Sequence, residues 1–389
     1  MKNNELKTVE IYATAFGGEG ICRIDGAVCF VEGAFAGEKV EIEITERKRN
    51  FLRARAVEII VPIDERIEGV CPLTFSCSNN KLWCPGCSYQ CISYEKEIEL
   101  KNVQFGDLLR KFAGINAEIR ESPIYSPQSL FYRNKLKLHK RHGGFGFFGN
   151  DNKTIVEVPK CYIAHEEINI NLDSLPLCDE ITLRYTKKDG VVIVDSDSSH
   201  LTEETLCGDF SVPASSFFQV NPYAHKLMLQ AYLDLLHKIS PDVLLDLYCG
   251  IGIFGIIASE QGIKSFGVEI DDKAVKMAEY NAKNHGVENL AAFVSGDVYS
   301  ISSALIERSK NYKTCAVLDP PRSGLDKKFA GMLSQSNLAD IIYISCSADT
   351  LCRDLKILQQ GGYEIISTRM IDMFPRTKHF ESITHLRKS

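Results

Sequence analysis

The sequence predicts an α/β protein, with a doubly wound parallel sheet behind a small β-barrel and a central α+β segment. The chain has 389 residues, which at roughly 150 residues per domain suggests two or three domains. Short strands separated by glycine turns occupy the N-terminal segment, whereas apolar strands alternate with helical patterns from about residue 207. We therefore expect domains at residues 1–62, 63–206 and 207–389.

Composition excludes several classes of protein. Hydrophobic residues make up 44% of the chain and charged residues 25%, so a mostly disordered chain is excluded. The first ten residues mix charges without an apolar run and do not form a secretory signal. The longest nearly uncharged stretch, Leu247 to Ser259, is too short to span a bilayer, so we expect a cytoplasmic protein with no membrane partner.

Residues 1–62 are predicted to form a small β-barrel of the oligonucleotide-binding kind. Val40, Ile42 and Ile44 alternate with polar residues, as in a half-buried strand. A basic run follows, with cations at Arg47, Lys48, Arg49, Arg53 and Arg55 around Phe51. A solvated loop is one interpretation of this run, and a phosphate-binding edge with an aromatic for stacking is the other. The net charge of −6 means that nucleic-acid binding would depend on such local patches.

Residues 63–206 contain a cysteine cluster, a predicted helix over 94–113 and a basic alternating strand over 131–142. Five cysteines fall within 21 residues, namely Cys71, Cys77, Cys84, Cys87 and Cys91. A cytoplasmic chain rarely uses such a cluster for disulfides, because that compartment keeps thiols reduced. The pattern therefore favours a metal or an iron–sulfur cluster.

A glycine-rich loop opens the C-terminal segment. Residues 246–255 follow an apolar strand, meet the Gly-x-Gly-x-x-Gly spacing and lead into a helix. Glu269 ends the next strand, well placed to accept hydrogen bonds from ribose hydroxyls. The loop alone allows a nicotinamide cofactor. The strand-end Asp319-Pro-Pro-Arg322, by contrast, is typical of base-modifying enzymes that use S-adenosylmethionine (SAM), and it has no role in hydride transfer.

Cys346 and Glu381 are candidates for the chemistry. Cys346 follows a predicted strand and precedes a helix, where backbone N–H groups are expected to lower the pKa of a thiol. The alternative is a buried structural cysteine. Glu381 stands just before the last strand, as either a surface charge or a general base.

Residues 207–389 resemble the catalytic domain of the RNA uracil-C5 methyltransferases. The matching motifs occur in the family's order and are Ser216–Pro222, Asp246–Phe254, Gly267–Glu269, Leu318–Leu325, Tyr343–Ser347 and Phe374–Glu381. Residues 7–60 resemble the RNA-binding TRAM domain, and Phe131–Lys135 matches the family's central domain. The resemblance implies methyl transfer from SAM to C5 of a uridine in RNA. Cys346 would add to C6, and Glu381 would remove the C5 proton.

The resemblance also implies the ligand sets. SAM would be held by Gln219, Tyr248, Glu269, Asp297 and Asp319. A [4Fe–4S] cluster would be held by Cys71, Cys84, Cys87 and Cys161, with Cys77 as the alternative first ligand and zinc as the alternative ion. The cluster cysteines and TRAM domain look more like the 23S rRNA branch, while a tRNA U54 enzyme is the alternative. A monomer is expected. The competing hypothesis, from another class of enzyme, is an iron–sulfur oxidoreductase that uses NAD.

Overall fold

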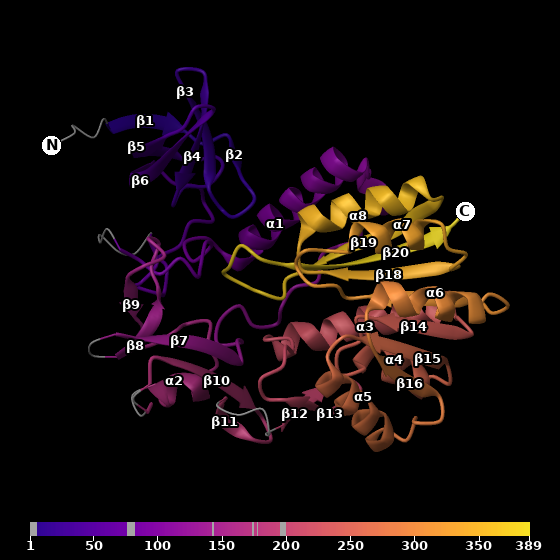
Figure 1. The fold of residues 1–389 in the computed structure, drawn as a ribbon. Coiled ribbons are helices and arrows are strands. Elements are labelled where there is room, and N and C mark those ends of the chain that lie inside the picture. The colour runs from indigo at the N-terminus through magenta and orange to yellow at the C-terminus, as the bar shows by residue number, and fades with distance from the viewer. Residues whose placement is uncertain (1–5, 76–81, 142–143, 173–174, 177, 195–199) are drawn as a thin grey trace.

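The computed structural model describes residues 6–75, 82–141, 144–172, 175–176, 178–194 and 200–389. Cys77 lies outside these residues. Four sheets follow one another along the chain (Figure 1). The N-terminal sheet stands apart at the upper left of that view, and the C-terminal sheet with its helices forms the large body at the right.

The first sheet has six strands in the order β1-β5-β6-β4-β3-β2. Its strands are β1 (Leu6–Glu10), β2 (Ala13–Thr14), β3 (Gly20–Ile24), β4 (Ala27–Glu32), β5 (Lys39–Arg47) and β6 (Phe51–Val61). Alternate residues point inward, so that Val40, Ile42 and Val31 are fully buried in one small core. The predicted strand over residues 39–45 is confirmed and extends to Arg47.

The central sheet has the order β11-β10-β7-β8-β9. It consists of β7 (Lys135–Arg141), β8 (Gly144–Phe148), β9 (Ile155–Glu157), β10 (Glu180–Thr186) and β11 (Gly190–Ile193), with helix α2 (Glu166–Ile170) packed against it. The basic strand begins at Lys135 and not at Phe131, because Phe131 has a left-handed backbone (φ 54°) that interrupts an extended strand. A hairpin of β12 (His200–Thr205) and β13 (Gly208–Pro213) leads into the last sheet.

The predicted helix over residues 94–113 is split. Helix α1 (Tyr94–Leu108) continues as a single π-helical turn (Leu109–Ala113), which ends at Gly114 with φ 68°. Its apolar side chains Ile98, Phe105 and Leu109 share a core with the C-terminal sheet. A short 3-10 turn (Ala117–Ile119) follows, and two bridges then join this segment to β19 (Tyr363–Ile371). The helix therefore packs with the C-terminal body, beside α8 (Ala348–Gln360) in Figure 1.

The last sheet has seven strands in the order β16-β15-β14-β17-β18-β20-β19, with β20 antiparallel to its neighbours. The remaining strands are β14 (Val243–Leu247), β15 (Lys264–Glu269), β16 (Ala291–Ser295), β17 (Thr314–Leu318), β18 (Asp340–Ser345) and β20 (Glu381–Lys388). The remaining helices are α3 (Pro222–Ile239), α4 (Ile253–Glu260), α5 (Asp272–Asn284), α6 (Val298–Arg308) and α7 (Lys327–Ser334).

Two cores cover the two faces of this sheet. Leu245 and Leu318 belong to the core that contains α1, α7 and α8, whereas Leu244 and Val317 belong to the core that contains α3 and α4. A strand that is buried on both faces carries a continuous apolar run, as these strands do. The predicted doubly wound sheet is confirmed, and its strand order reverses between β14 and β17, where such folds bind their ligands.

Candidate active site

The backbone of the loop after β14 allows a ligand to approach it closely. Tyr248, Gly250 and Gly252 all have left-handed backbones, with φ of 73°, 51° and 82°. A Cβ on Gly252 would lie 2.7 Å from the ring of Phe293, so only glycine fits there. Asp246 accepts a hydrogen bond of 2.8 Å from the Gly255 N–H, which ties the loop to the start of α4. Burial raises the pKa of Asp246 to about 7.

Glu269 lies across this loop at the end of β15. One carboxylate oxygen accepts a hydrogen bond of 3.0 Å from the Gly250 N–H. The other accepts from the backbone N–H groups of Ile270 at 2.8 Å and Asp271 at 3.1 Å. The structure therefore fixes this carboxylate at the edge where β14 and β15 end. Three backbone donors hold it in place.

Gln219 belongs to the segment between β13 and α3. It is 6% exposed, and its Oε1 has no hydrogen-bond partner among the described residues. A buried carbonyl oxygen without a donor carries a desolvation cost that a ligand donor would remove. The neighbouring Asn221 caps α3 and donates to Ser126 Oγ at 3.0 Å and to the Met373 carbonyl at 3.1 Å.

Asp297 is on the opposite side of the loop, at the N-cap of α6. Its carboxylate accepts from the backbone N–H of Ser300 at 2.8 Å and from the Ser300 hydroxyl at 2.7 Å. These hydrogen bonds lower its pKa. Asp297 also raises the pKa of Tyr248, after burial, which places its charge near the Tyr248 phenol. The Gln219 oxygen lacks a hydrogen-bond donor and the glycine loop allows close approach, so both features would fit bound SAM.

Strand register brings Cys346 and Glu381 together. Ser345 of β18 pairs with Ser382 of the antiparallel β20, so the next residue of one strand faces the preceding residue of the other. Asp319 follows β17, the parallel neighbour of β18. Cys346, Glu381 and Asp319 therefore lie at three adjacent strand ends. They come from motifs that are up to 62 residues apart in the chain, counted from Asp319 to Glu381.

The predicted lowering of the Cys346 pKa is wrong. The pKa of its half-buried thiol is raised to about 11, first by burial, then by the negative charges of Glu381 and Asp319. The Arg322 guanidinium acts in the opposite direction. Helix α8 does start just after Cys346, at the N-cap Ser347, but its backbone N–H groups contribute less than burial does.

Glu381 is a buried carboxyl with unmet hydrogen-bonding capacity. It is 2% exposed, and its Oε2 has no hydrogen-bond partner among the residues that the structure describes. Burial and the neighbouring Asp319 raise its pKa well above the usual value, and Arg322 lowers it. Burial also raises the pKa of Asp319 to about 7. Such a group takes up or releases a proton more readily near neutral pH than an exposed glutamate does.

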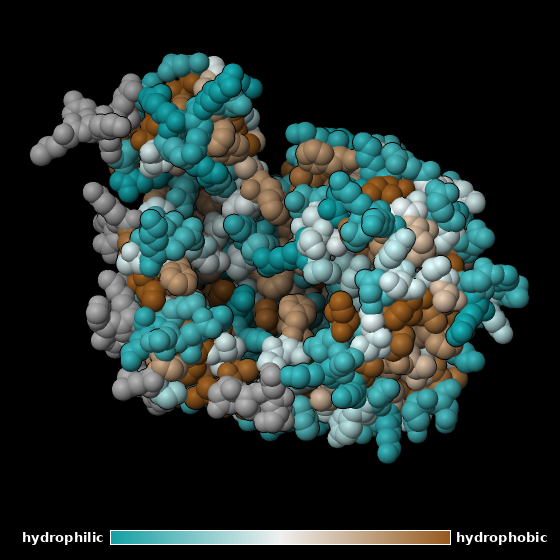
Figure 2. Space-filling model, in the orientation of Figure 1, coloured by the Kyte–Doolittle hydropathy of each residue, from teal (hydrophilic) through white to brown (hydrophobic). Residues whose placement is uncertain are grey.

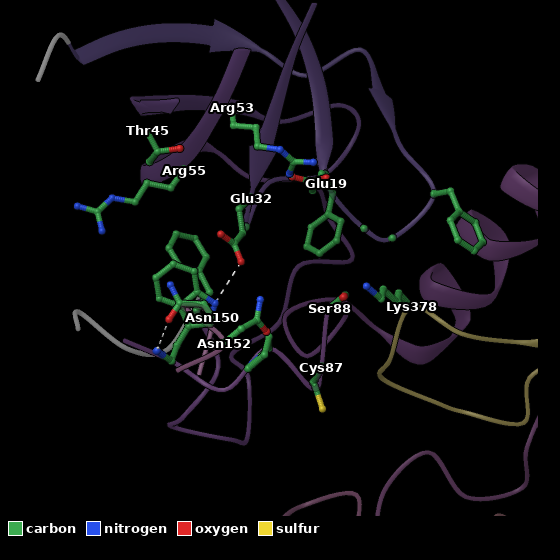
Figure 3. A pocket seen from close by; sticks show the side chains of 18 residues that line it. Glu19, Glu32, Thr45, Arg53, Arg55, Cys87, Ser88, Asn150, Asn152 and Lys378 are labelled. Atoms are coloured by element: carbon green, nitrogen blue, oxygen red, sulfur yellow. Dashed lines mark hydrogen bonds and ion pairs between the residues drawn. The ribbon is translucent and has the colours of Figure 1, made fainter. Parts of the chain in front are cut away.

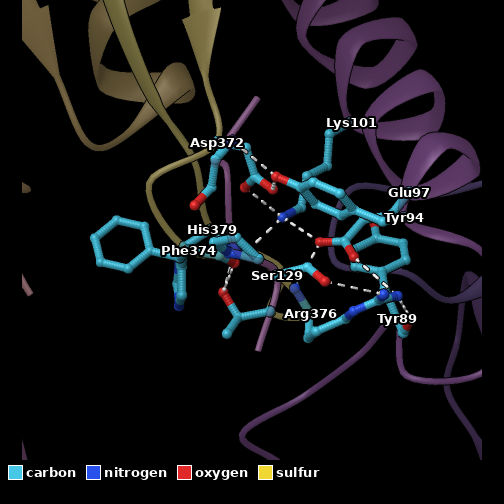
Figure 4. Close-up of polar contacts among 12 residues, drawn as sticks. Tyr89, Tyr94, Glu97, Lys101, Ser129, Asp372, Phe374, Arg376 and His379 are labelled. Carbon is cyan, nitrogen blue, oxygen red and sulfur yellow. Dashed lines mark hydrogen bonds and ion pairs between the residues drawn. The ribbon is translucent and has the colours of Figure 1, made fainter. Parts of the chain in front are cut away.

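A buried polar network, which sequence reasoning missed, holds the segment before Glu381 (Figure 4). The fully buried Lys101 of α1 donates to Glu97 at 2.7 Å and to Asp372 at 2.8 Å. The Arg376 N–H donates to Glu97 at 2.7 Å, and the Arg376 guanidinium donates to the Ile92 carbonyl at 2.9 Å. The spacing of Glu97 and Lys101, four residues apart on a helix, was the available signal.

This network also connects to the cysteine-rich segment. The backbone N–H groups of Ser88 and Tyr89 both donate to the Arg376 carbonyl, at 2.9 and 3.1 Å. Tyr132 donates through its hydroxyl to the Pro375 carbonyl at 2.9 Å. The cysteine-rich segment, the central segment and the loop that leads to Glu381 are thus held by direct hydrogen bonds.

The four predicted cluster cysteines share one neighbourhood without forming a closed ligand set. Burial raises the pKa of the Cys84 thiol to about 11, and the charges of Cys161 and Cys71 raise it further. The pKa of Cys87 is likewise raised by burial and by Cys161, Cys84 and Cys71. Within the described ranges, however, no three cysteine, histidine or acidic side chains are close enough together to hold a metal ion.

Several cations of the two basic runs, on the barrel and on β7, already have partners. On the barrel, Lys48 pairs with Glu46 and Arg53 pairs with Glu19, both at 2.5 Å, and Arg55 pairs with Glu43. On β7, Lys137 pairs with Glu180 at 2.7 Å, and Lys135 donates to the Ser216 carbonyl at 3.1 Å. These carboxylates reduce the local positive field, which the sequence pattern alone overstated.

Comparison with known proteins identifies the family. A family model described as tRNA (Uracil-5-)-methyltransferase matches residues 208–389, and the TRAM domain model matches residues 2–57. An uncharacterised RNA methyltransferase of Aquifex aeolicus is 30% identical over 439 residues, covering 99% of each chain. The chain belongs to the tRNA (uracil-5-)-methyltransferase family. It is a SAM-dependent RNA (uracil-5-)-methyltransferase, as its motifs predicted.

A second relative and one solved structure also match the chain over nearly its whole length. An uncharacterised RNA methyltransferase of Clostridium acetobutylicum is 28% identical, in an alignment that covers 100% of this chain and 98% of the relative. The fold matches that of the Pyrococcus abyssi tRNA (uracil-54, C5)-methyltransferase, solved with S-adenosyl-L-homocysteine, with a TM-score of 0.73 and 22% identity over 98% of this chain and 100% of that chain. Among the described residues, no helix is long and apolar enough to cross a membrane.

Proposed function

We propose that this methyltransferase modifies C5 of a uridine in 23S rRNA through a covalent bond between Cys346 and C6. The observation that carries this proposal is the register of β18 and β20, which brings the thiol and the Glu381 carboxyl to facing strand ends. The electrostatic effect of Glu381 on the Cys346 thiol agrees with that proximity. In this proposal the enzyme acts as a cytoplasmic monomer.

The reaction proceeds in steps, and Cys346 and Glu381 act in different steps. C5 of uracil is a poor nucleophile, so the Cys346 sulfur first adds to C6 and moves electron density onto C5. C5 then forms its new bond to the methyl carbon, whose bond to the sulfur of SAM would break with its electron pair remaining on that sulfur. Glu381 removes the C5 proton, and the electron pair of that C–H bond expels the Cys346 thiolate from C6. Both groups must be ionised when they act.

SAM supplies the methyl group as an electrophile when it is bound. We propose that Gln219, Tyr248, Glu269, Asp297 and Asp319 hold it. Glu269 is fixed by three backbone donors, and the buried Gln219 oxygen lacks a donor that a ligand could provide. These two features support binding at the carboxyl ends of β14 and β15, beside the point between β14 and β17 where the strand order reverses.

The choice of RNA rests on two different observations. The TRAM barrel together with the cysteine cluster favours rRNA, as in the branch that the sequence resembles. A tRNA substrate with U54 as its target is the second candidate, because the Pyrococcus abyssi neighbour of similar fold acts on tRNA. Mass mapping of 5-methyluridine in rRNA and tRNA from a deletion strain separates them. Loss from 23S rRNA supports the proposal, and loss from tRNA alone overturns it.

We further propose that Cys71, Cys84, Cys87 and Cys161 hold a [4Fe–4S] cluster. Their mutual effects on thiol pKa support a shared site, and deprotonation by iron would relieve the raised pKa of these thiols. Anaerobically purified protein should then contain about four iron and four sulfide per chain and absorb as an iron–sulfur protein. Stoichiometric zinc without sulfide would contradict the proposal.

We expect activity to increase with pH, and Arg322 to set where that increase occurs. The pKa values of Cys346 and Glu381 are both raised, so the fraction of each group that is ionised, and therefore able to act, grows as the pH rises. Arg322 lowers both values, and Arg322→Met should shift the rise in kcat/KM to higher pH. If the variant shifts this rise by one pKa unit, its kcat/KM at pH 7.5 should be about tenfold lower than that of the wild type. Arg322→Lys, which keeps the charge, is the control, and coincident pH profiles for all three proteins would contradict this role.

A further inference from the structure

A cavity of about 970 Å³ lies between the barrel, the cysteine-rich segment and the loop that leads to Glu381 (Figure 3). Its lining comes from four parts of the chain, represented by Glu32 of β4, Trp83, Asn150 and Lys378. Figure 2 shows that the surface is hollowed between the barrel at the upper left and the large body at the right. Neither SAM nor the target uridine requires this cavity, because their proposed residues lie at the strand ends of the last sheet. Cys87, a proposed cluster ligand, lines one side of it, and its sulfur points away from Glu32 in Figure 3.

Aromatic rings form part of the cavity wall. The rings of Phe75 and Trp83 have centroids 4.9 Å apart, and both line the cavity. Gly33 makes room for them, because a Cβ there would lie 2.3 Å from the Phe75 ring. Trp83 is fixed by Asn150, which accepts from the Trp83 N–H at 3.2 Å and donates to its carbonyl at 3.1 Å. Trp83 is buried behind Phe75, and the partly exposed Phe75 ring offers a surface on which a base can stack.

Glu32 provides the polar group inside the cavity. Its Oε1 accepts a hydrogen bond of 3.1 Å from the indole N–H of Trp83, which orients the carboxyl (Figure 3). A carboxylate has about four lone-pair sites, so this bond leaves both oxygens able to accept from a ligand. Burial raises the pKa of Glu32 to about 7, the mark of a carboxylate that is short of donors.

Cations lie around the same cavity. Arg53, Arg55 and Lys378 line it together with Glu32. Ion pairs with Glu19 and Glu43 fix the guanidinium groups of Arg53 and Arg55 and partly offset their charge, and Glu19 also lines the cavity. A ligand that offers N–H donors to Glu32 and a phosphate to these cations matches both sets of groups. A nucleotide has this combination.

The cavity adjoins the proposed active site. Lys378 precedes Glu381 by three residues, a span of about 11 Å at most. The barrel contacts the same segment, since the rings of Phe16 and Phe380 have centroids 6.0 Å apart. A nucleotide in the cavity would therefore lie only a short length of RNA from the uridine at Cys346.

We propose that this cavity binds one unstacked guanine nucleotide of the substrate RNA, close in sequence to the target uridine. Guanine presents N1–H and N2–H on one edge, which can donate together to the two oxygens of Glu32. Uracil presents one ring N–H, and adenine and cytosine present an amino group beside an acceptor, so none forms this pair of bonds with the ionised carboxylate. The inference rests on the proposed action on RNA. A free guanine nucleotide offers the same edge and is distinguished in the test.

The test measures binding of ten-nucleotide, dye-labelled RNAs to the full-length protein by fluorescence anisotropy, without SAM. Oligouridine carries one central guanine, adenine or cytosine, or none. The guanine RNA should bind about tenfold more tightly than the other three. Glu32→Gln should remove this preference and leave oligouridine binding unchanged. Glu58→Gln, at an exposed glutamate of β6 in the same barrel, is the matched control and should keep the preference.

Equal affinity for all four RNAs, or an unchanged preference in Glu32→Gln, would overturn the proposal. Guanosine monophosphate that binds as tightly as the guanine RNA would overturn the assignment to RNA in favour of a free nucleotide. A 6-thioguanosine at the central position should photo-crosslink to a peptide with Phe75 or Trp83, and a crosslink elsewhere would contradict the site. Because methylation is not measured, a wild-type protein that shows the preference but does not methylate uridine would refute only the proposed function.

Discussion

Cys346→Ala is expected to abolish methylation, with kcat lower by about 10⁴-fold or more. The nearby Cys352, fully buried in α8, and Cys315, fully buried in β17, cannot replace it. The affinity for SAM should not change, because Glu269 and the glycine loop are held by their own hydrogen bonds. Steady-state methyl transfer from labelled SAM, with calorimetric titration of SAM, measures both quantities.

The matched control for this variant is Cys207→Ala, in the turn between β12 and β13. Cys207 also has a raised pKa, about 11, because of burial and the nearby Glu260. It lies outside the proposed site, so this variant should keep wild-type kcat. Turnover by Cys346→Ala within tenfold of the control would exclude Cys346 as the nucleophile.

Glu381→Gln is expected to stop the reaction after the covalent bond has formed. The amide keeps the shape of the side chain but cannot remove the C5 proton, so kcat should fall by about 10³-fold. Protein bound covalently to RNA should then accumulate, visible as a band of reduced mobility on a denaturing gel. Glu364→Gln, at an exposed glutamate of β19, is the control and should give neither effect. A slow Glu381→Gln enzyme without the covalent band would mean that Glu381 acts before the adduct forms.

The buried strands and their motifs could be predicted from the sequence. The apolar strand that was expected before the glycine-rich loop is present as Val243–Leu247, because a strand covered on both faces needs a continuous apolar run. Cys346 and Glu381 were singled out by motif, and antiparallel pairing then brought them together. The pairing itself depends on strand order, which no local pattern encodes.

The features that were missed depend on contacts between distant parts of the chain. Lys101 and Asp372 are 271 residues apart, and nothing near either one indicates the other. The pKa of Cys346 was predicted in the wrong direction because the helix start is visible in the sequence, whereas burial and the facing carboxyls are not. For the same reason the partners Glu19 and Glu43 of the basic run could not be foreseen.

The central claim is a covalent bond between Cys346 and C6 of a uridine, and 5-fluorouridine RNA tests it most directly. Fluorine at C5 cannot be removed as a proton, so the methylated adduct should persist once it has formed. Wild-type protein, SAM and a fluorinated 23S rRNA fragment should give a stable complex whose digested peptide carries the nucleotide on Cys346. Absence of a complex under conditions where the unfluorinated RNA is methylated, or attachment to a different residue, would contradict the account.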